Sequence, residues 1–119
     1  MEKMYCDHER EHLAAAQRAR EGVLASEDVE KMCKIFQILS DPGRMKIVLA
    51  LMNGEMCVYH LTEVCQSSVS AVSHQLRIMR DNKIVKSRRF GKNVEYSIAD
   101  EHVCKMVTMA VEHLQCSVE

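Results

Sequence analysis

The sequence predicts a mainly α-helical fold with a β-hairpin wing, that is, a winged helix-turn-helix, and three observations lead to this prediction. Two short helical patterns flank the polar turn "QSS". The segment after them changes to an alternating period, with a glycine between its two halves. A longer amphipathic helix follows the hairpin. The 119 residues are expected to form one domain, and 47% hydrophobic with 28% charged residues is typical of a globular protein.

Three helices are expected before the helix-turn-helix. Residues 9–24 predict the first, which forms an N-terminal arm with its neighbours over residues 1–25. The segment "SEDVEKMCKIFQIL" predicts the second, because its apolar residues recur at helical spacing. Asp41-Pro42 then combines an N-cap with proline at the first helical position. This third helix is expected to stop at Asn53-Gly54.

A helix-turn-helix is predicted over residues 57–81, from "CVYHLTEVC" to "VSAVSHQLRIMRD". One side of its second helix is apolar, with Val69, Val72, Leu76 and Met79. The polar candidates for DNA contact, on the turn and the opposite side, are Ser68, Ser70, Ser73, His74 and Arg77. Short hydroxyls, an imidazole and a guanidinium can enter a major groove and reach base edges and phosphates. A polar face is common on any helix, so an ordinary solvated surface is the alternative.

A wing is predicted over residues 84–98, where "IVKSRRF" and "VEYSI" flank the turn "GKN". Arg88, Arg89 and Lys92 are expected at or near its tip, placed to meet phosphates or the minor groove. Seven basic residues and one acid lie between Arg77 and Lys92, although the net charge of the chain is only −1. A basic segment in a nearly neutral chain indicates a surface that contacts double-stranded DNA.

The helix predicted over residues 101–116 has metal-ligand types at both ends, Asp100 and His102 at one and His113 and Cys116 at the other. A rise of 1.5 Å per residue places the two histidines roughly 16 Å apart, whereas zinc reaches its ligands at about 2.0–2.3 Å. One chain therefore cannot direct both histidines to one ion. A second copy of the helix, crossing antiparallel, would give two identical sites, each drawing two ligands from each chain. An ordinary helix with a capping aspartate and surface histidines is the alternative.

Together these segments resemble the ArsR/SmtB family of bacterial metal-responsive repressors. The resemblance covers about residues 28–116 and depends on "ILSDPGRMKIVLAL", "SAVSHQLRIMRDNKIVKSRRFGKNVEYSI" and the terminal Asp-x-His…His pattern. It implies a homodimer, joined through its N- and C-terminal helices, that releases operator DNA on binding Zn(II) and so controls metal efflux or sequestration genes. Cys116 stands where zinc sensors usually have a carboxylate or histidine, which improves the case for Cd(II) and Pb(II), with Co(II) also considered.

The resemblance also implies a second metal site between the N-terminal arm and the helix-turn-helix. Many relatives have Cys-Val-Cys-Asp where this chain has Cys57, then Tyr59 and His60, so a three-thiolate arsenite site is not expected. Cys57 and His60 could instead act with ligands from the arm, for which the candidates are Cys6, His8 and His12. Whether this second site exists is left open.

Other functions are compatible with parts of the sequence. A thiol redox-sensing repressor could use Cys57 and Cys6, and a metal-buffering protein would need no operator. A zinc enzyme is not expected, because no open three-ligand site with a neighbouring general base is evident. The charged N-terminus and the absence of a long apolar run predict a cytoplasmic protein with no membrane partner. No small-molecule substrate is expected of a metal-responsive repressor.

Overall fold

The computed structural model describes residues 8–22 and 25–116, and the chain divides into two compact units, residues 1–33 and 34–119. The first unit contains α1 (Glu9–Gly22) and the beginning of α2 (Ser26–Leu39). No residue of α1 is buried. The described part of the helix predicted over residues 9–24 is Glu9–Gly22, and residues 23–24 lie outside the described part of the chain.

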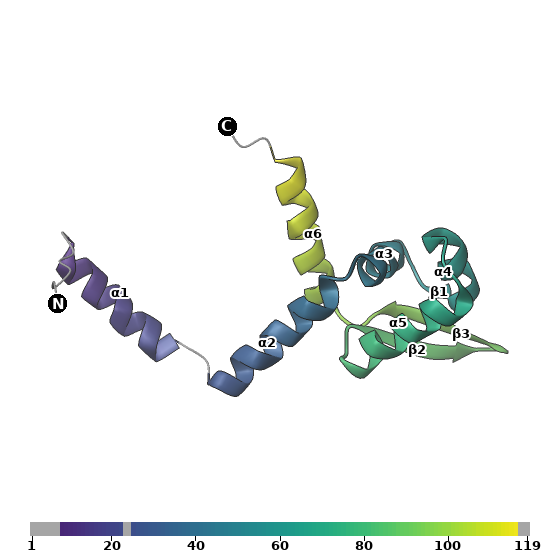
Figure 1. Cartoon of the computed structure of the whole chain (residues 1–119), viewed down its shortest axis with the longest axis horizontal. Helices are drawn as coiled ribbons and strands as arrows, with labels where there is room; N and C mark the ends of the chain where they lie inside the picture. The colour runs from purple at the N-terminus through teal and green to yellow at the C-terminus, as the bar shows by residue number, and fades with distance from the viewer. Residues whose placement is uncertain (1–7, 23–24, 117–119) are drawn as a thin grey trace. The chain divides into compact units, whose positions relative to one another are not determined.

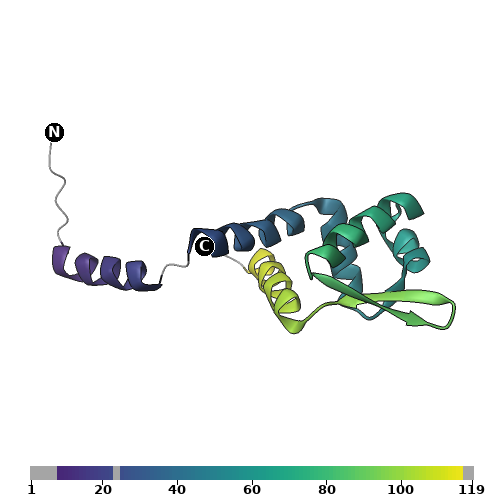
Figure 2. The same ribbon diagram turned by 90° about the horizontal axis from the view of Figure 1, so that it is seen from below.

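The second unit is the predicted winged helix-turn-helix (Figure 1). Its helices are the end of α2, then α3 (Pro42–Leu51), α4 (Val58–Cys65), α5 (Val69–Asp81) and α6 (Glu101–Gln115). An antiparallel sheet has the strand order β1-β3-β2, with β1 (Met56–Cys57), β2 (Val85–Phe90) and β3 (Asn93–Ile98). The β2–β3 hairpin lies along one side of the helices (Figure 2). Among the described residues, no helix is both long and apolar enough to span a bilayer.

The core of the second unit lies between α3, α4, α5 and the sheet. Leu61 of α4 and Met79 of α5 are fully buried, and Ile47 of α3 and Leu76 of α5 are each only 1% exposed. Burying a side chain of this size contributes about 1.5–3 kcal/mol relative to leaving it in water. The core therefore fixes how α5 is rotated about its own axis, which decides the face that it presents outside.

Local signals set the ends of these helices. Asp41 caps α3 by accepting the backbone N–H of Arg44 at 2.9 Å, and Pro42 occupies the first turn, as predicted. α4 ends at Gln66, whose left-handed φ of 52° turns the chain sharply. Ser68 then caps α5 by accepting the N–H of Ala71 at 3.0 Å. The polar "QSS" turn is thus a helix stop followed directly by a helix start.

The strand register assigns the wing side chains to two faces. Ser87 pairs with Tyr96, and Arg89 with Val94, so they lie on the face that begins with buried Val85. On the opposite face, Arg88 pairs with Glu95 and Phe90 with Asn93. Gly91, with a φ of +63°, allows the tight turn between the strands.

The structure differs from the sequence prediction at two places in the helix-turn-helix. The segment predicted over residues 57–81 begins as a helix only at Val58, because Met56 and Cys57 form β1 and pair with Tyr96 and Glu95 of β3. This strand was not predicted. Val69, expected on the apolar side of α5, is 43% exposed because it stands in the first turn, beyond the edge of the core.

The packing of α4 gives a stability prediction. Leu61→Ala should lower the free energy of unfolding by about 2–5 kcal/mol, because it removes buried methyl groups and leaves a cavity. Val64→Ala on the same helix is the matched control, since Val64 is 59% exposed, and its cost should stay within about 0.5 kcal/mol. Urea denaturation at a fixed protein concentration measures both. Equal losses in the two variants would contradict this account of the core.

Candidate DNA-binding surface and metal-ligand residues

The predicted DNA-contacting residues of α5 are all exposed. Val72, Leu76 and Met79 turn into the core, so Ser70, Ser73, His74 and Arg77 occupy the outer side of the helix. Ser68 stands at the helix start, where its Oγ accepts the backbone N–H of Ala71. Its hydroxyl hydrogen remains available for donation. The arrangement is that of a helix with one buried and one polar face, which suits insertion into a major groove.

Arg44 holds α5 in place and was not singled out by sequence reasoning. Its Nε donates to the carbonyl of Ile38 at 2.8 Å, and its Nη1 donates to Oε1 of Gln75 at 2.9 Å. These bonds join the end of α2 and the start of α3 to the middle of α5. The partners are up to 31 residues apart, so no local sequence signal could have identified them.

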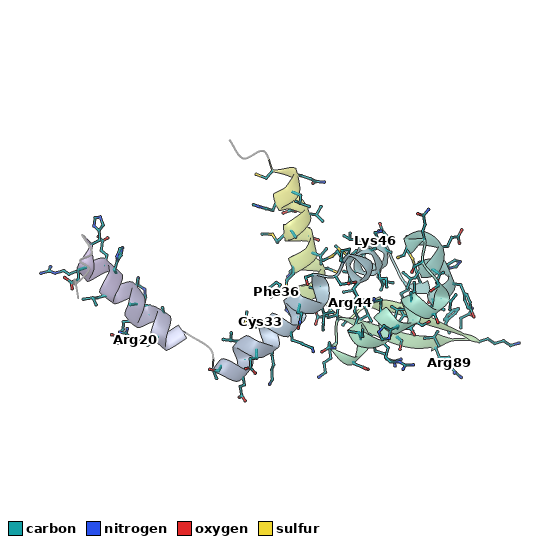
Figure 3. The ribbon with its side chains drawn as sticks, viewed as in Figure 1. Arg20, Cys33, Phe36, Arg44, Lys46 and Arg89 are labelled. Carbon is teal, nitrogen blue, oxygen red and sulfur yellow. The ribbon has the colours of Figure 1, made fainter. Side chains whose placement is uncertain are left out.

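All three predicted wing residues, Arg88, Arg89 and Lys92, are exposed. The Arg89 side chain projects from the hairpin (Figure 3). Lys92 lies in the turn between β2 and β3. Both cations can therefore approach a DNA backbone without first breaking a contact within the second unit.

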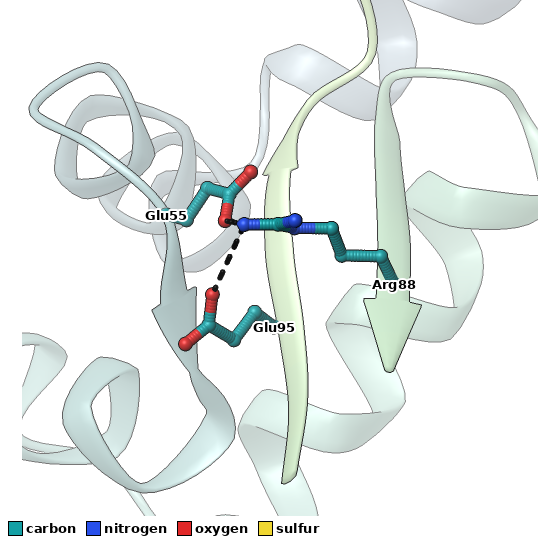
Figure 4. A network of polar contacts seen from close by, with 3 residues as sticks. All are labelled: Glu55, Arg88 and Glu95. Atoms are coloured by element: carbon teal, nitrogen blue, oxygen red, sulfur yellow. Dashed lines mark hydrogen bonds and ion pairs between the residues drawn. The ribbon is translucent and has the colours of Figure 1, made fainter. Parts of the chain in front are cut away.

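Arg88, the third predicted wing contact, is engaged within the protein. Its Nε and Nη2 donate to Oε2 of Glu55 at 3.1 and 2.8 Å, and Nη2 lies 3.9 Å from Oε2 of Glu95 (Figure 4). The Arg88 guanidinium also lies 5.6 Å from the centre of the Phe90 ring. Hydrogen bonding from Arg88 lowers the pKa of Glu55, and the same contact raises the pKa of Arg88. Glu55 was missed from the sequence because its partner lies 33 residues away.

Asp100 and His102 lie together at the start of α6. Asp100 is the N-cap, and its Oδ1 accepts the backbone N–H groups of His102 and Val103 at 2.9 and 3.3 Å. The Nδ1 atom of His102 lies 3.5 Å from the same oxygen. Both side chains are exposed.

His113 and Cys116 lie at the other end of α6 and are exposed. The helix ends at Gln115, and Cys116 has extended backbone angles of −74° and 125°. The helix predicted over residues 101–116 thus stops one residue early, and helical spacing does not fix the direction of the Cys116 thiol. Within the part of the chain that the structure describes, no three ligand-type side chains come together in a geometry that could hold a metal.

The residues of the possible second site are partly described. Cys57 Sγ lies 3.6 Å from Nδ1 of His60, which confirms that these two side chains are neighbours. In the first unit, the rings of His8 and His12 are 6.1 Å apart, edge to face, and Nδ1 of His8 lies 4.0 Å from Glu11. Cys6 lies outside the described residues.

Comparison with known proteins places the chain in a family. Residues 41–87 match the family described as "Bacterial regulatory protein, arsR family". A "Transcriptional repressor SmtB homolog" from Synechocystis is 40% identical over 110 residues, which is 92% of this chain and 83% of the relative. A "Cadmium resistance transcriptional regulatory protein CadC homolog" from Staphylococcus aureus is 37% identical over 114 residues, 95% of this chain and 93% of the relative.

A solved structure shares the fold. It is the solution structure of a homodimeric winged helix-turn-helix DNA-binding domain from Mycobacterium bovis, with a TM-score of 0.69 and 21% identity. The match covers 82% of this chain and 97% of that one. The relatives are transcriptional regulators with a DNA-binding fold, not enzymes. The chain belongs to the ArsR family of bacterial regulatory proteins.

Proposed function

We propose that the chain is a homodimeric, metal-responsive repressor that releases operator DNA on binding Zn(II) and controls genes for metal efflux or sequestration. Cd(II), Pb(II) and Co(II) are alternative effectors. The observation that carries the proposal is the pair of candidate ligand sets at the two ends of α6. At one end, Nδ1 of His102 lies 3.5 Å from Oδ1 of Asp100. The names of the SmtB and cadmium-resistance relatives support a metal signal. A repressor of this kind would act in the cytoplasm.

Uncovered apolar surface supports dimerisation through the terminal helices. An apolar groove of about 360 Å³ is lined by Phe36, Leu39, Ser40, Met45, Met106, Val107 and Ala110. Farther along α6, Leu114 is 84% exposed. A second copy of α6 would cover such surface and bring Asp100 and His102 of one chain toward His113 and Cys116 of the other. The homodimeric relative from Mycobacterium bovis provides a precedent for this fold.

The ligand types fit a zinc-like ion. One carboxylate, two imidazoles and one thiolate make a four-ligand set of the kind that Zn(II) binds tetrahedrally. The ion would link the two chains, and the dimer could then favour an arrangement with lower affinity for DNA. Cys116 adds a soft ligand, which improves binding of Cd(II) and Pb(II) relative to an all-oxygen-and-nitrogen site. Cys57 and His60 are the candidates for a second metal contact.

The exposed face of α5 and the wing are the proposed DNA contacts, which gives a salt-dependence prediction. Binding of the metal-free dimer to a duplex selected by the wild-type protein from a random pool should weaken steeply with salt. Arg89→Gln should lower the slope of log K against log salt by about 0.9 for each phosphate that the variant no longer neutralises. Fluorescence anisotropy measures both. No preference over a random duplex, or a flat salt dependence, would contradict the assigned surface.

The inter-subunit metal site can be tested by complementation. His102→Ala and His113→Ala homodimers should each bind metal weakly, because both of their sites lack a ligand. In the mixed heterodimer both defects fall in one site, and the other site has all four ligands. A tight site, at least about tenfold stronger than in either homodimer, should therefore reappear once per heterodimer.

Competition with a zinc chelator on tag-purified heterodimer measures this affinity. The two mutant homodimers, treated and purified in the same way, are the controls. A heterodimer that binds no better than the homodimers would show that α6 does not supply a site shared between the chains.

A thiol redox sensor is the second candidate, favoured by the 3.6 Å contact between Cys57 Sγ and the His60 ring. Burial raises the pKa of the other helix-turn-helix thiol, Cys65, and so disfavours its reactive thiolate. Under the metal proposal, added Zn(II) releases DNA from the Cys57→Ser variant as from wild type, and a chelator reverses the release. Release by peroxide without metal, abolished by Cys57→Ser, would instead establish the redox function.

A further inference from the structure

Neighbouring arginines of the wing lie on opposite faces of the sheet. Arg89 shares a face with Val85, the face that continues from the core, whereas Arg88 pairs with Glu95 on the outer face. The outer face also contains Lys86, which pairs with Ser97. Two adjacent cations that look equivalent in the sequence are therefore placed in different surroundings.

The charges around Arg88 argue against a phosphate partner. Its guanidinium hydrogen-bonds Glu55 and lies 3.9 Å from Glu95, so two carboxylates surround one cation. A small groove beside the Arg88 guanidinium is lined by Glu55, Lys86, Ser87, Arg88 and Ser97. Besides Glu55 and Arg88, the charged residue of this lining is Lys86. A phosphate that approached Arg88 would be repelled by both carboxylates or would have to displace them.

The position of Glu55 gives the ion pair a consequence for the fold. Glu55 directly precedes β1, and β1 leads without a break into α4, the first helix of the helix-turn-helix. Arg88 reaches from β2 across β3 to this residue (Figure 4). Because β1 is only two residues long, its pairing with β3 alone is a short connection. The Glu55–Arg88–Glu95 cluster therefore ties all three strands, and with them the wing, to the start of α4.

We propose that Arg88 is a positioning residue and not a DNA contact: through Glu55 and Glu95 it sets the orientation of the wing relative to the helix-turn-helix. The wing cations that meet DNA are then Arg89 and Lys92. This inference rests on the proposed DNA-binding function. It assigns to Arg88 and Glu55 a shared role in operator affinity.

The sign of the Glu55→Gln effect separates the two roles. If Arg88 contacted phosphate, removing the Glu55 charge would free the guanidinium and tighten operator binding. If Arg88 positions the wing, the same change should weaken binding, by about two- to fivefold for each subunit, a range that corresponds to a surface ion pair. Glu63 is exposed on α4 and lies outside the cluster. Glu63→Gln removes the same charge as Glu55→Gln and serves as the matched control.

A double-mutant cycle provides the second readout. Arg88→Gln should weaken binding at least as much as Glu55→Gln does, and the double variant should be no weaker than Arg88→Gln alone, because the Arg88→Gln change already removes the interaction with Glu55. Arg89→Gln combined with Glu55→Gln should instead give additive losses. Binding is measured by fluorescence anisotropy on the selected duplex. Tighter binding by Glu55→Gln than by Glu63→Gln would overturn the proposal. So would binding free-energy losses that add in the Glu55→Gln/Arg88→Gln double variant.

Amide hydrogen exchange in the DNA-free dimer keeps this test separate from the test of function. Glu55→Gln and Arg88→Gln should both speed exchange in the outer part of the wing, residues 88–94, whereas Arg89→Gln should not. Unchanged exchange in both cluster variants would overturn the positioning role, whatever the protein binds. A wild-type protein without preference for the selected duplex would reject the DNA-binding function and leave the exchange result to decide the role of the cluster.

Discussion

Burial of Val72, Leu76 and Met79 beneath α5 is the constraint on which the rest of the recognition surface depends. These side chains are at most 2% exposed, so α5 cannot rotate about its axis without exposing apolar surface. The opposite face is thereby determined by hydrophobic packing before any contact with DNA. Arg44 adds direction to this packing, because its bond to Gln75 fixes α5 against the end of α2.

The same separation of faces operates in the wing, where electrostatics decides what each cation can do. Strand alternation alone places Arg88 and Arg89 on opposite faces. On the outer face Arg88 meets two carboxylates, one from β3 and one from the residue before β1. A count of basic residues treats both arginines as DNA contacts. In the three-dimensional arrangement the Arg89 charge is available, whereas the Arg88 charge is paired with carboxylates of the protein.

The sequence predicted the elements whose signals are local. Asp41-Pro42 marks a helix start through a cap three residues away, and the structure confirms this cap. Ser68 caps α5 in the same local way, although from the sequence it was predicted only as a turn residue and a candidate DNA contact. The strand β1 escaped prediction because two residues cannot establish a period, and its partners Tyr96 and Glu95 are distant in the chain. Glu55 and Arg44 were missed for the same reason. The spacing of the candidate ligands on α6 followed from helical rise, but the proposed metal site would need a second chain, which a single sequence does not show.

The start of α6 is connected to α5 through the backbone, so an effect of metal at the start of α6 has a physical route to α5. Ala99, next to Asp100, donates its N–H to the carbonyl of Ile84 at 3.0 Å, and Ile84 donates to the carbonyl of Met79 at 2.8 Å. Two backbone hydrogen bonds therefore join the residue before Asp100 to the end of α5. Proximity alone does not create coupling, which requires that the metal bind one of two dimer arrangements more tightly. Because Ile84 and Met79 are buried, a displacement of Asp100 that followed this connection would have to move packed core residues, so coupling would need a second packed arrangement of the dimer that metal favours.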